Sequence, residues 1–86
     1  MGTYSKLRRN ILAGGADSNV EFFALCQLLI RLGFDERSRS SHHIFTRHGV
    51  DEIINLQPKG SKAKAYQVNQ IRSSLVKYRL GESDVD

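Results

Sequence analysis

The sequence predicts a small α+β domain in which three antiparallel strands form a sheet and helices cover one of its faces. Three segments carry apolar residues at helical spacing, two before residue 33 and one after residue 67. Between them lie β-branched and aromatic residues that are separated by turn signals. The resulting order of helix, helix, strand, strand, strand, helix is typical of an α+β domain. A chain of 86 residues has room for one hydrophobic core.

The two N-terminal helices are predicted by apolar stripes of different width. The narrower stripe ends before Gly14–Gly15 and consists of Tyr4, Leu7 and Ile11. The wider stripe consists of Phe22, Leu25, Cys26, Leu28, Leu29 and Leu32. We expect this second helix to begin from a capping box of Ser18 and Glu21, in which each side chain bonds a free N–H of the other residue, and to end at Gly33.

The middle of the chain predicts the three strands. Residues 34–40 contain few apolar side chains, which favours an edge strand or an irregular one. Residues 42–47 favour a second strand because β-branched and aromatic side chains occur there. We expect a tight turn at His48–Gly49 and a third strand over residues 52–56, which stops before Pro58.

A basic loop and a last helix complete the predicted domain. Residues 58–64, PKGSKAK, are expected to form a flexible loop. The stripe of the last helix consists of Val68, Ile71, Leu75 and Tyr78. Lys77 and Arg79 should lie in its final turn, where positive charge is favourable, and Gly81 should end it.

Positive charge is concentrated in the centre of the chain. The formal net charge is +4. Residues 31–79 contain ten basic and four acidic residues, which gives +6, whereas residues 80–86 carry −3. Such a concentration favours a polyanionic partner, most often nucleic acid. An ordinary solvated surface remains an open alternative.

Several classes of protein are disfavoured. No apolar run reaches the ~18–20 residues of a transmembrane helix, and the first ten residues lack the apolar segment of a secretory signal. Cys26 is the single cysteine and cannot form an internal disulfide, and its place in a helical stripe favours packing over catalysis. No Gly-rich loop with the following Lys-Ser or Lys-Thr of a phosphate site occurs. We therefore expect a cytoplasmic protein with no membrane partner.

The segment SSHHIF, residues 40–45, contains the residues that best suit chemistry. Side chains alternate along a strand, so His42 and His43 should point to opposite faces. Phe45 suits the covered face, which leaves His42 on the open one. Basic residues would surround His42 if their loops fold over that side: Arg39, Lys59, Lys62 and Lys64.

A histidine among cationic side chains suits the cleavage of RNA. It can remove the proton of the 2′-hydroxyl or protonate the leaving 5′ oxygen, because the pKa of a free imidazole is about 6.5. Cations would stabilise the phosphorane-like transition state. A surface or packing role for the two adjacent histidines is the alternative.

No metal and no cofactor are predicted. His42, His43 and His48 form an HHx4H pattern, but two of the three do not easily share a tetrahedral centre because strand neighbours point apart. No other group of ligand residues has an established spacing.

With these residues in view, the chain resembles the HicA family of bacterial toxin ribonucleases over about residues 22–80. The similarity is carried by LCQLLIRLGF, by SSHHIF and by IINLQPKGSKAKAYQVNQIRSSLVKYRL. Family members typically have Gly-Ser-His at the start of the second strand, followed by an aromatic residue. Here Ser41, His42 and Phe45 match, and Ser40 stands in the place of the glycine.

The resemblance implies a fold, an activity and a partner. HicA proteins have an α-β-β-β-α fold like the double-stranded-RNA-binding domain. They cleave mRNA with the motif histidine, here His42, without a required metal, and a HicB antitoxin neutralises them by covering the histidine-bearing face. The implied organisation is an N-terminal extension with a short helix over residues 1–20, a HicA-like domain over 21–81 and an acidic tail over 82–86.

We therefore predict a type II toxin that acts as an endoribonuclease, with a HicB-like antitoxin as its protein partner. His42 is the predicted catalytic residue, and His43 replaces it if the strand register turns His43 outward. The residues predicted to bind RNA are Arg39, Ser41, Lys59, Lys62 and Lys64. Two other functions stay open: a non-catalytic module that binds double-stranded RNA, and a protein-interaction domain whose basic face meets an acidic partner.

Overall fold

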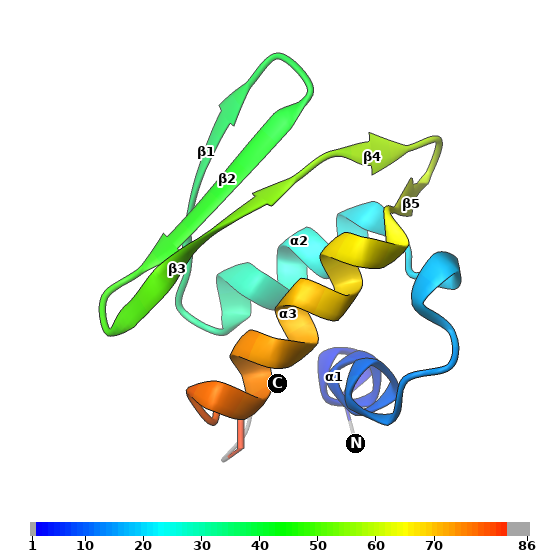
Figure 1. Cartoon of the computed structure of the whole chain (residues 1–86), viewed down its shortest axis with the longest axis vertical. Coiled ribbons are helices and arrows are strands. Elements are labelled where there is room, and N and C mark those ends of the chain that lie inside the picture. The colour runs from blue at the N-terminus through cyan, green and yellow to red at the C-terminus, as the bar shows by residue number, and fades with distance from the viewer. Residues whose placement is uncertain (1, 83–86) are drawn as a thin grey trace.

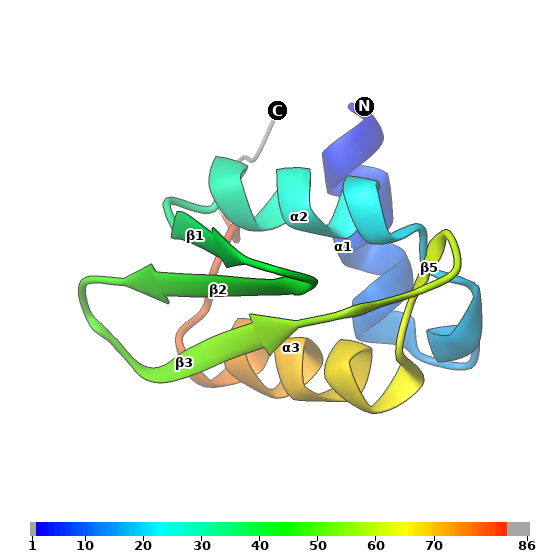
Figure 2. The same cartoon turned by 90° about the horizontal axis from the view of Figure 1, so that it is seen from above.

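A computed structural model describes residues 2–82 and confirms an α+β fold with a three-stranded antiparallel sheet. The sheet has the order β1-β2-β3, and its strands are β1 (Asp35–Arg39), β2 (His42–Arg47) and β3 (Val50–Leu56). The helices are α1 (Thr3–Ala13), α2 (Phe22–Arg31) and α3 (Ala65–Lys77). All three lie on the same side of the sheet (Figures 1 and 2). We call this side the covered face and the opposite side the open face.

The core lies between the covered face and the helices. Phe45 is fully buried, and Ile54 and Leu56 of β3 are buried with it. They join one cluster with the apolar stripes of α2 and α3, whose buried members include Leu25, Leu28, Leu29, Val68, Ile71 and Leu75. The alternation of side chains in β2 and the helical spacing of apolar residues in α2 and α3 therefore place their apolar side chains in the same core.

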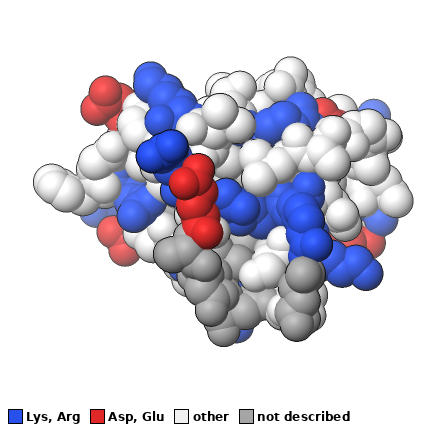
Figure 3. Space-filling model, turned by 90° about the horizontal axis from the view of Figure 1, so that it is seen from below, with Lys and Arg blue, Asp and Glu red and all other residues white. Residues whose placement is uncertain are grey.

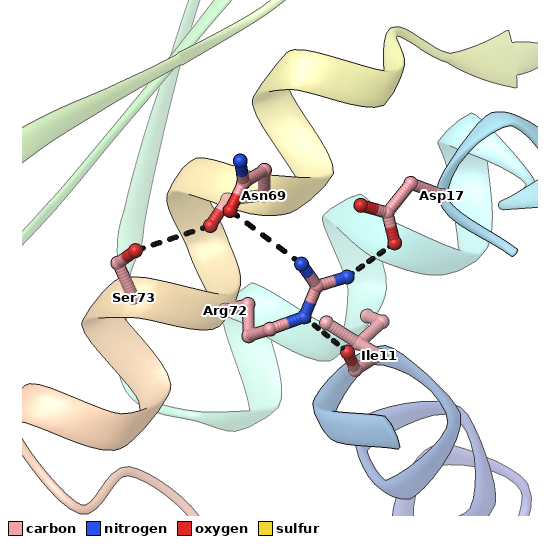
Figure 4. Close-up of polar contacts among 5 residues, drawn as sticks. All are labelled: Ile11, Asp17, Asn69, Arg72 and Ser73. Atoms are coloured by element: carbon pink, nitrogen blue, oxygen red, sulfur yellow. Dashed lines mark hydrogen bonds and ion pairs between the residues drawn. The ribbon is translucent and has the colours of Figure 1, made fainter. Parts of the chain in front are cut away.

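The short helix α1 packs on this core through Ile11, which is 2% exposed. Arg72 of α3 holds the end of α1 in place: its Nε donates a hydrogen bond of 2.6 Å to the Ile11 carbonyl oxygen (Figure 4). The same guanidinium forms an ion pair with Asp17, in the 3-10 turn η1 (Asp17–Asn19) that follows α1. The N-terminal segment is therefore part of the packed domain.

Residues 58–64 form a hairpin and not the flexible loop that their composition indicated. Its two short strands are β4 (Pro58–Lys59) and β5 (Lys62–Ala63). The hairpin is fixed to the start of α2, because the backbone N–H of Phe22 donates to the Ser61 carbonyl at 3.0 Å and that of Ala63 donates to the Val20 carbonyl at 2.9 Å. These partners are about 40 residues apart in the chain, which local composition does not reveal.

Two predicted helix boundaries are wrong. No described side chain caps α2, because Ser18 lies in η1 and the Glu21 carboxylate accepts a hydrogen bond of 2.8 Å from Lys62 Nζ. At the other end of the chain, α3 stops at Lys77, and Arg79 lies beyond it in the left-handed region with φ 54°. The predicted end of α2 is confirmed, since Gly33 follows the helix with φ 96°.

None of the helices described within residues 2–82 is long and apolar enough to cross a lipid bilayer. The predicted acidic tail, residues 82–86, falls mostly outside the described residues.

Candidate active site

The strand register places His42 on the open face. In the antiparallel pairs, Arg39 lies opposite His42, and Ile44 lies opposite Arg37 on one side and Asn55 on the other. Phe45 is fully buried in the covered face, so its neighbours in alternation point away from the helices. His42 is exposed, as this alternation predicts.

Asn55 of β3 contacts the imidazole of His42. The distance from His42 Nδ1 to Asn55 Oδ1 is 3.3 Å. An amide oxygen only accepts, so this hydrogen bond requires the proton to be on Nδ1. The neutral ring then presents Nε2 as the nitrogen with a free lone pair, which is the form that a general base needs.

A shallow depression of about 520 Å³ lies on the open face beside His42. It is lined by Arg37, Arg39, Ile44 and Thr46. Both arginines are exposed, and neither forms an ion pair with a described residue. Two unpaired guanidinium groups next to an imidazole provide the charge and the hydrogen-bond donors that a phosphate group requires.

The turn that precedes His42 has two residues, Ser40 and Ser41. Ser40 adopts φ 53°, in the left-handed region that favours glycine. The Ser41 Oγ accepts a hydrogen bond of 3.3 Å from Gln57 Nε2, and the Gln57 Oε1 accepts one of 3.0 Å from Lys64 Nζ. Gln57 therefore connects the serine beside His42 to one of the lysines that were predicted to bind RNA.

The other predicted lysines lie around the β4–β5 hairpin. Lys59, Lys62 and Lys64 line one pocket of about 280 Å³. Lys62 forms an ion pair of 2.8 Å with Glu21. No hydrogen bond described within residues 2–82 joins Lys59 or Lys62 to His42. Of the predicted residues, the structure thus brings Arg39, Ser41 and His42 together, links Lys64 through Gln57, and places Lys59 and Lys62 in the hairpin.

His43 lies on the covered face, because the register turns it toward α2. Its Nδ1 donates a hydrogen bond of 2.6 Å to Glu36 Oε2, and its ring meets the Phe22 ring edge-on with 5.0 Å between centroids. The register therefore does not turn His43 outward, which was the condition for His43 to replace His42 as the catalytic residue. His48 lies in the turn at the far end of β2, so the three histidines do not share one site.

Cys26 is unsuited to nucleophilic catalysis. The residue is 5% exposed within the α2 stripe, as predicted. Burial raises the pKa of its thiol to about 12, with a further contribution from the negative charge of Glu36. The thiol therefore keeps its proton at neutral pH, whereas the thiolate is the nucleophilic form.

Three residues near the candidate site were not predicted: Arg37, Asn55 and Gln57. Arg37 has a sequence signal, because it lies two positions from Arg39 and thus on the same face of an extended strand. Asn55 and Gln57 approach residues 40–42 only through strand pairing, which needs the register. Comparisons with family models, with curated proteins and with solved structures found no match to this chain.

Proposed function

We propose that this protein cleaves mRNA with His42 as the general acid or base, as the toxin of a HicA-type toxin–antitoxin pair. The observation that carries the proposal is the exposed His42 imidazole, which lies between Arg39 and Asn55 on the open face. The order α2-β1-β2-β3-α3 suits the double-stranded-RNA-binding-domain-like fold of that family, and we assign the chain to this fold as part of the same proposal.

The proposed reaction is an attack of the RNA on its own backbone. His42 Nε2 removes the proton of the 2′-hydroxyl, the 2′ oxygen bonds to the adjacent phosphorus, and the bond from phosphorus to the 5′ oxygen breaks. The products are a 2′,3′-cyclic phosphate and a 5′-hydroxyl, and the latter takes its proton from the protonated imidazole or from water. Arg37 and Arg39 stabilise the added negative charge of the transition state.

The size of the expected effect follows from acid–base catalysis. A positioned acid or base contributes about 10² to 10⁴ in rate. His42→Ala should therefore slow the cleavage of end-labelled RNA by about that factor, and it should relieve growth inhibition on expression. His48→Ala is the matched control, because it removes an exposed histidine from the other end of β2.

The assay should contain a chelator, so that cleavage by contaminating metal-dependent nucleases is excluded. Cleavage by the wild type and by His48→Ala, together with its loss in a folded His42→Ala, would support the proposal. Equal cleavage by all three proteins would rule out His42 as the catalytic residue.

One observation favours the alternative, a module that binds double-stranded RNA without cleaving it. Cleavage is most efficient when one group acts as the base and a second as the acid, and no second described histidine joins His42 on the open face. This alternative predicts a shifted but intact RNA band, with affinity that falls steeply as salt is added.

A HicB-like antitoxin is the proposed protein partner, and we place it over the open face. Ile53 alternates with the buried Ile54 and is 65% exposed there. An apolar side chain on the same face of the sheet as Arg37 and Arg39 suits a protein surface that carries both acidic and apolar groups. Copurification with an antitoxin of this family, and loss of the complex in Ile53→Asp, would test this placement.

A further inference from the structure

Three side chains of metal-binding type converge on the covered face. They are Cys26 of α2, Glu36 of β1 and His43 of β2, and one ligand atom from each lies within 4.8 Å of the other two. They belong to three different elements, and the sheet separates them from the side of His42. The catalytic proposal above uses none of them.

The fold holds these groups in place before any ion binds. Glu36 pairs with Phe45 in the register and Ser38 pairs with His43, so the Glu36 and His43 side chains are diagonal neighbours on one face. The hydrogen bond from His43 Nδ1 to Glu36 Oε2 fixes both side chains. Phe22 lies one helical turn before Cys26 and packs its ring against the His43 imidazole.

We propose that Cys26, Glu36 and His43 form a binding site for a divalent transition-metal ion, and that Zn²⁺ fits it best. A sulfur, a nitrogen and a carboxylate oxygen form a borderline-soft ligand set that suits Zn²⁺, whereas Mg²⁺ and Ca²⁺ prefer oxygen ligands alone. On binding, Cys26 becomes a thiolate and its proton leaves to solvent.

The spacing needs only a small adjustment. Ligand atoms around a tetrahedral Zn²⁺ lie roughly 3.3 to 3.8 Å apart, since the bonds are roughly 2.0 to 2.3 Å long. Separations of up to 4.8 Å therefore have to close by about 1 to 1.5 Å, which side-chain rotation can supply. If His43 Nδ1 and Glu36 Oε2 are the ligand atoms, their separation of 2.6 Å widens instead. The Glu36 and His43 side chains are 25% and 27% exposed, so an ion and a water molecule as fourth ligand have access from solvent.

Such an ion would have a structural effect on the sheet. All five residues of β1 are exposed, and among the described strands this edge strand pairs only with β2. A metal ion bound by both Glu36 and Cys26 would link β1 to α2 on the covered face. The same strand presents Arg37 and Arg39 on the open face, so the ion would also steady the arginines of the depression.

The test uses the full chain, reduced and freed of metal, without RNA. We expect Co²⁺ to bind with one equivalent and to give the near-ultraviolet charge-transfer band of a thiolate–cobalt bond. We expect Zn²⁺ to displace Co²⁺ and to raise the melting temperature. Cys26→Ser should abolish the band, and Glu36→Gln and His43→Ala should weaken binding by roughly tenfold or more.

His42→Ala and His48→Ala are the matched controls, because they remove histidines outside the cluster, and both should bind Co²⁺ like the wild type. Absence of the thiolate–cobalt band in the wild type would overturn the proposal. So would Co²⁺ binding that is unchanged in Glu36→Gln and His43→Ala. These two variants, with their partly exposed side chains, keep the test decisive if Cys26→Ser does not fold.

Discussion

His42 and Asn55 lie on adjacent strands, with 3.3 Å between His42 Nδ1 and Asn55 Oδ1, on the face of the sheet that the helices leave open. Residue 55 is the last outward position of β3 before the chain turns to the hairpin. Its amide is therefore in a position to select the histidine tautomer. In the proposed mechanism, Asn55 is a positioning residue and not a catalytic one.

Asn55→Ala should lower kcat and leave KM nearly unchanged. A neutral hydrogen bond contributes about 1 kcal/mol, which corresponds to a factor of about five to ten in rate. Asn55→Asp should retain the orienting contact and move the acidic limb of the pH–rate profile to higher pH, because a carboxylate stabilises the imidazolium. The readout is the rate of RNA cleavage across pH. A profile that is the same in Asn55→Asp and the wild type would show that residue 55 does not act on His42.

Ser40→Gly should stabilise the protein. Ser40 has φ 53° at the first position of a two-residue hairpin turn, where glycine is preferred. This conformation costs a non-glycine residue about 1 to 2 kcal/mol of free energy. The greater conformational freedom of glycine in the unfolded chain offsets part of the stability that the substitution adds. We expect a net increase of about 0.5 to 1 kcal/mol in the free energy of unfolding, measured by urea titration.

Ser41→Gly is the matched control, because Ser41 is not in the left-handed region. It should be neutral or destabilising. If Ser40→Gly is no more stable than the wild type, the turn does not hold residue 40 in a strained conformation.

The elements that were predicted from the sequence are those with a local pattern. The stripe from Phe22 to Leu32 specifies a buried helix face, and the alternation around Phe45 specifies which way His42 points. The capping box was wrong because the Glu21 carboxylate accepts a hydrogen bond from Lys62, which is 41 residues away in the chain. The hairpin of residues 58–64 depends on similarly distant backbone bonds to Val20 and Phe22.

The candidate site could be predicted only in part, because some of its contacts join residues that are far apart in the chain. His42 and Arg39 are near neighbours in sequence, and a two-residue turn brings them opposite each other. Asn55 reaches His42 only when β3 pairs with β2 in one particular register. The group formed by Cys26, Glu36 and His43 needs both a strand register and the placement of α2, and no spacing in the sequence encodes either.

Arg39→Ala should weaken RNA binding more than the removal of a basic residue elsewhere. Lys and Arg side chains also gather on the face that is seen from below the view of Figure 1, so positive charge alone does not single out the open face (Figure 3). Each lost phosphate contact reduces the slope of log affinity against log salt by about 0.7 for single-stranded RNA. We expect this reduction for Arg39→Ala and for Arg37→Ala, measured by fluorescence anisotropy with a non-cleavable RNA.

Arg9→Ala is the matched control, because it removes an exposed arginine of α1 and the same formal charge. It should leave the salt slope close to that of the wild type. Equal losses in Arg9→Ala and Arg39→Ala would mean that the RNA binds through overall charge and not at the depression.

Acid should destabilise the protein in part through Glu52 of β3. The Tyr78 hydroxyl donates a hydrogen bond to Glu52, and Lys77 Nζ lies 3.0 Å from its other carboxylate oxygen. These contacts, with Tyr78 as the larger cause, lower the pKa of Glu52 below its ordinary value. A lowered pKa in the folded state means that the unfolded chain binds the proton more readily. The stabilisation is therefore present above the unfolded pKa of about 4.3 and is lost as the pH falls through the folded value.

Glu52→Gln removes this titration, so its stability should depend less on pH below about 4.3 than that of the wild type. The measurement is the midpoint of urea unfolding at a series of pH values from neutral to strongly acidic. Asp51→Asn is the control, because Asp51 is an exposed carboxylate next to Glu52 and no described side chain forms an ion pair with it. Parallel acid profiles for Glu52→Gln and the wild type would show that the contacts from the end of α3 to β3 do not stabilise the ionised carboxylate. A flattened profile in Glu52→Gln alone would establish that Tyr78 and Lys77 fasten the second edge strand of the sheet to α3.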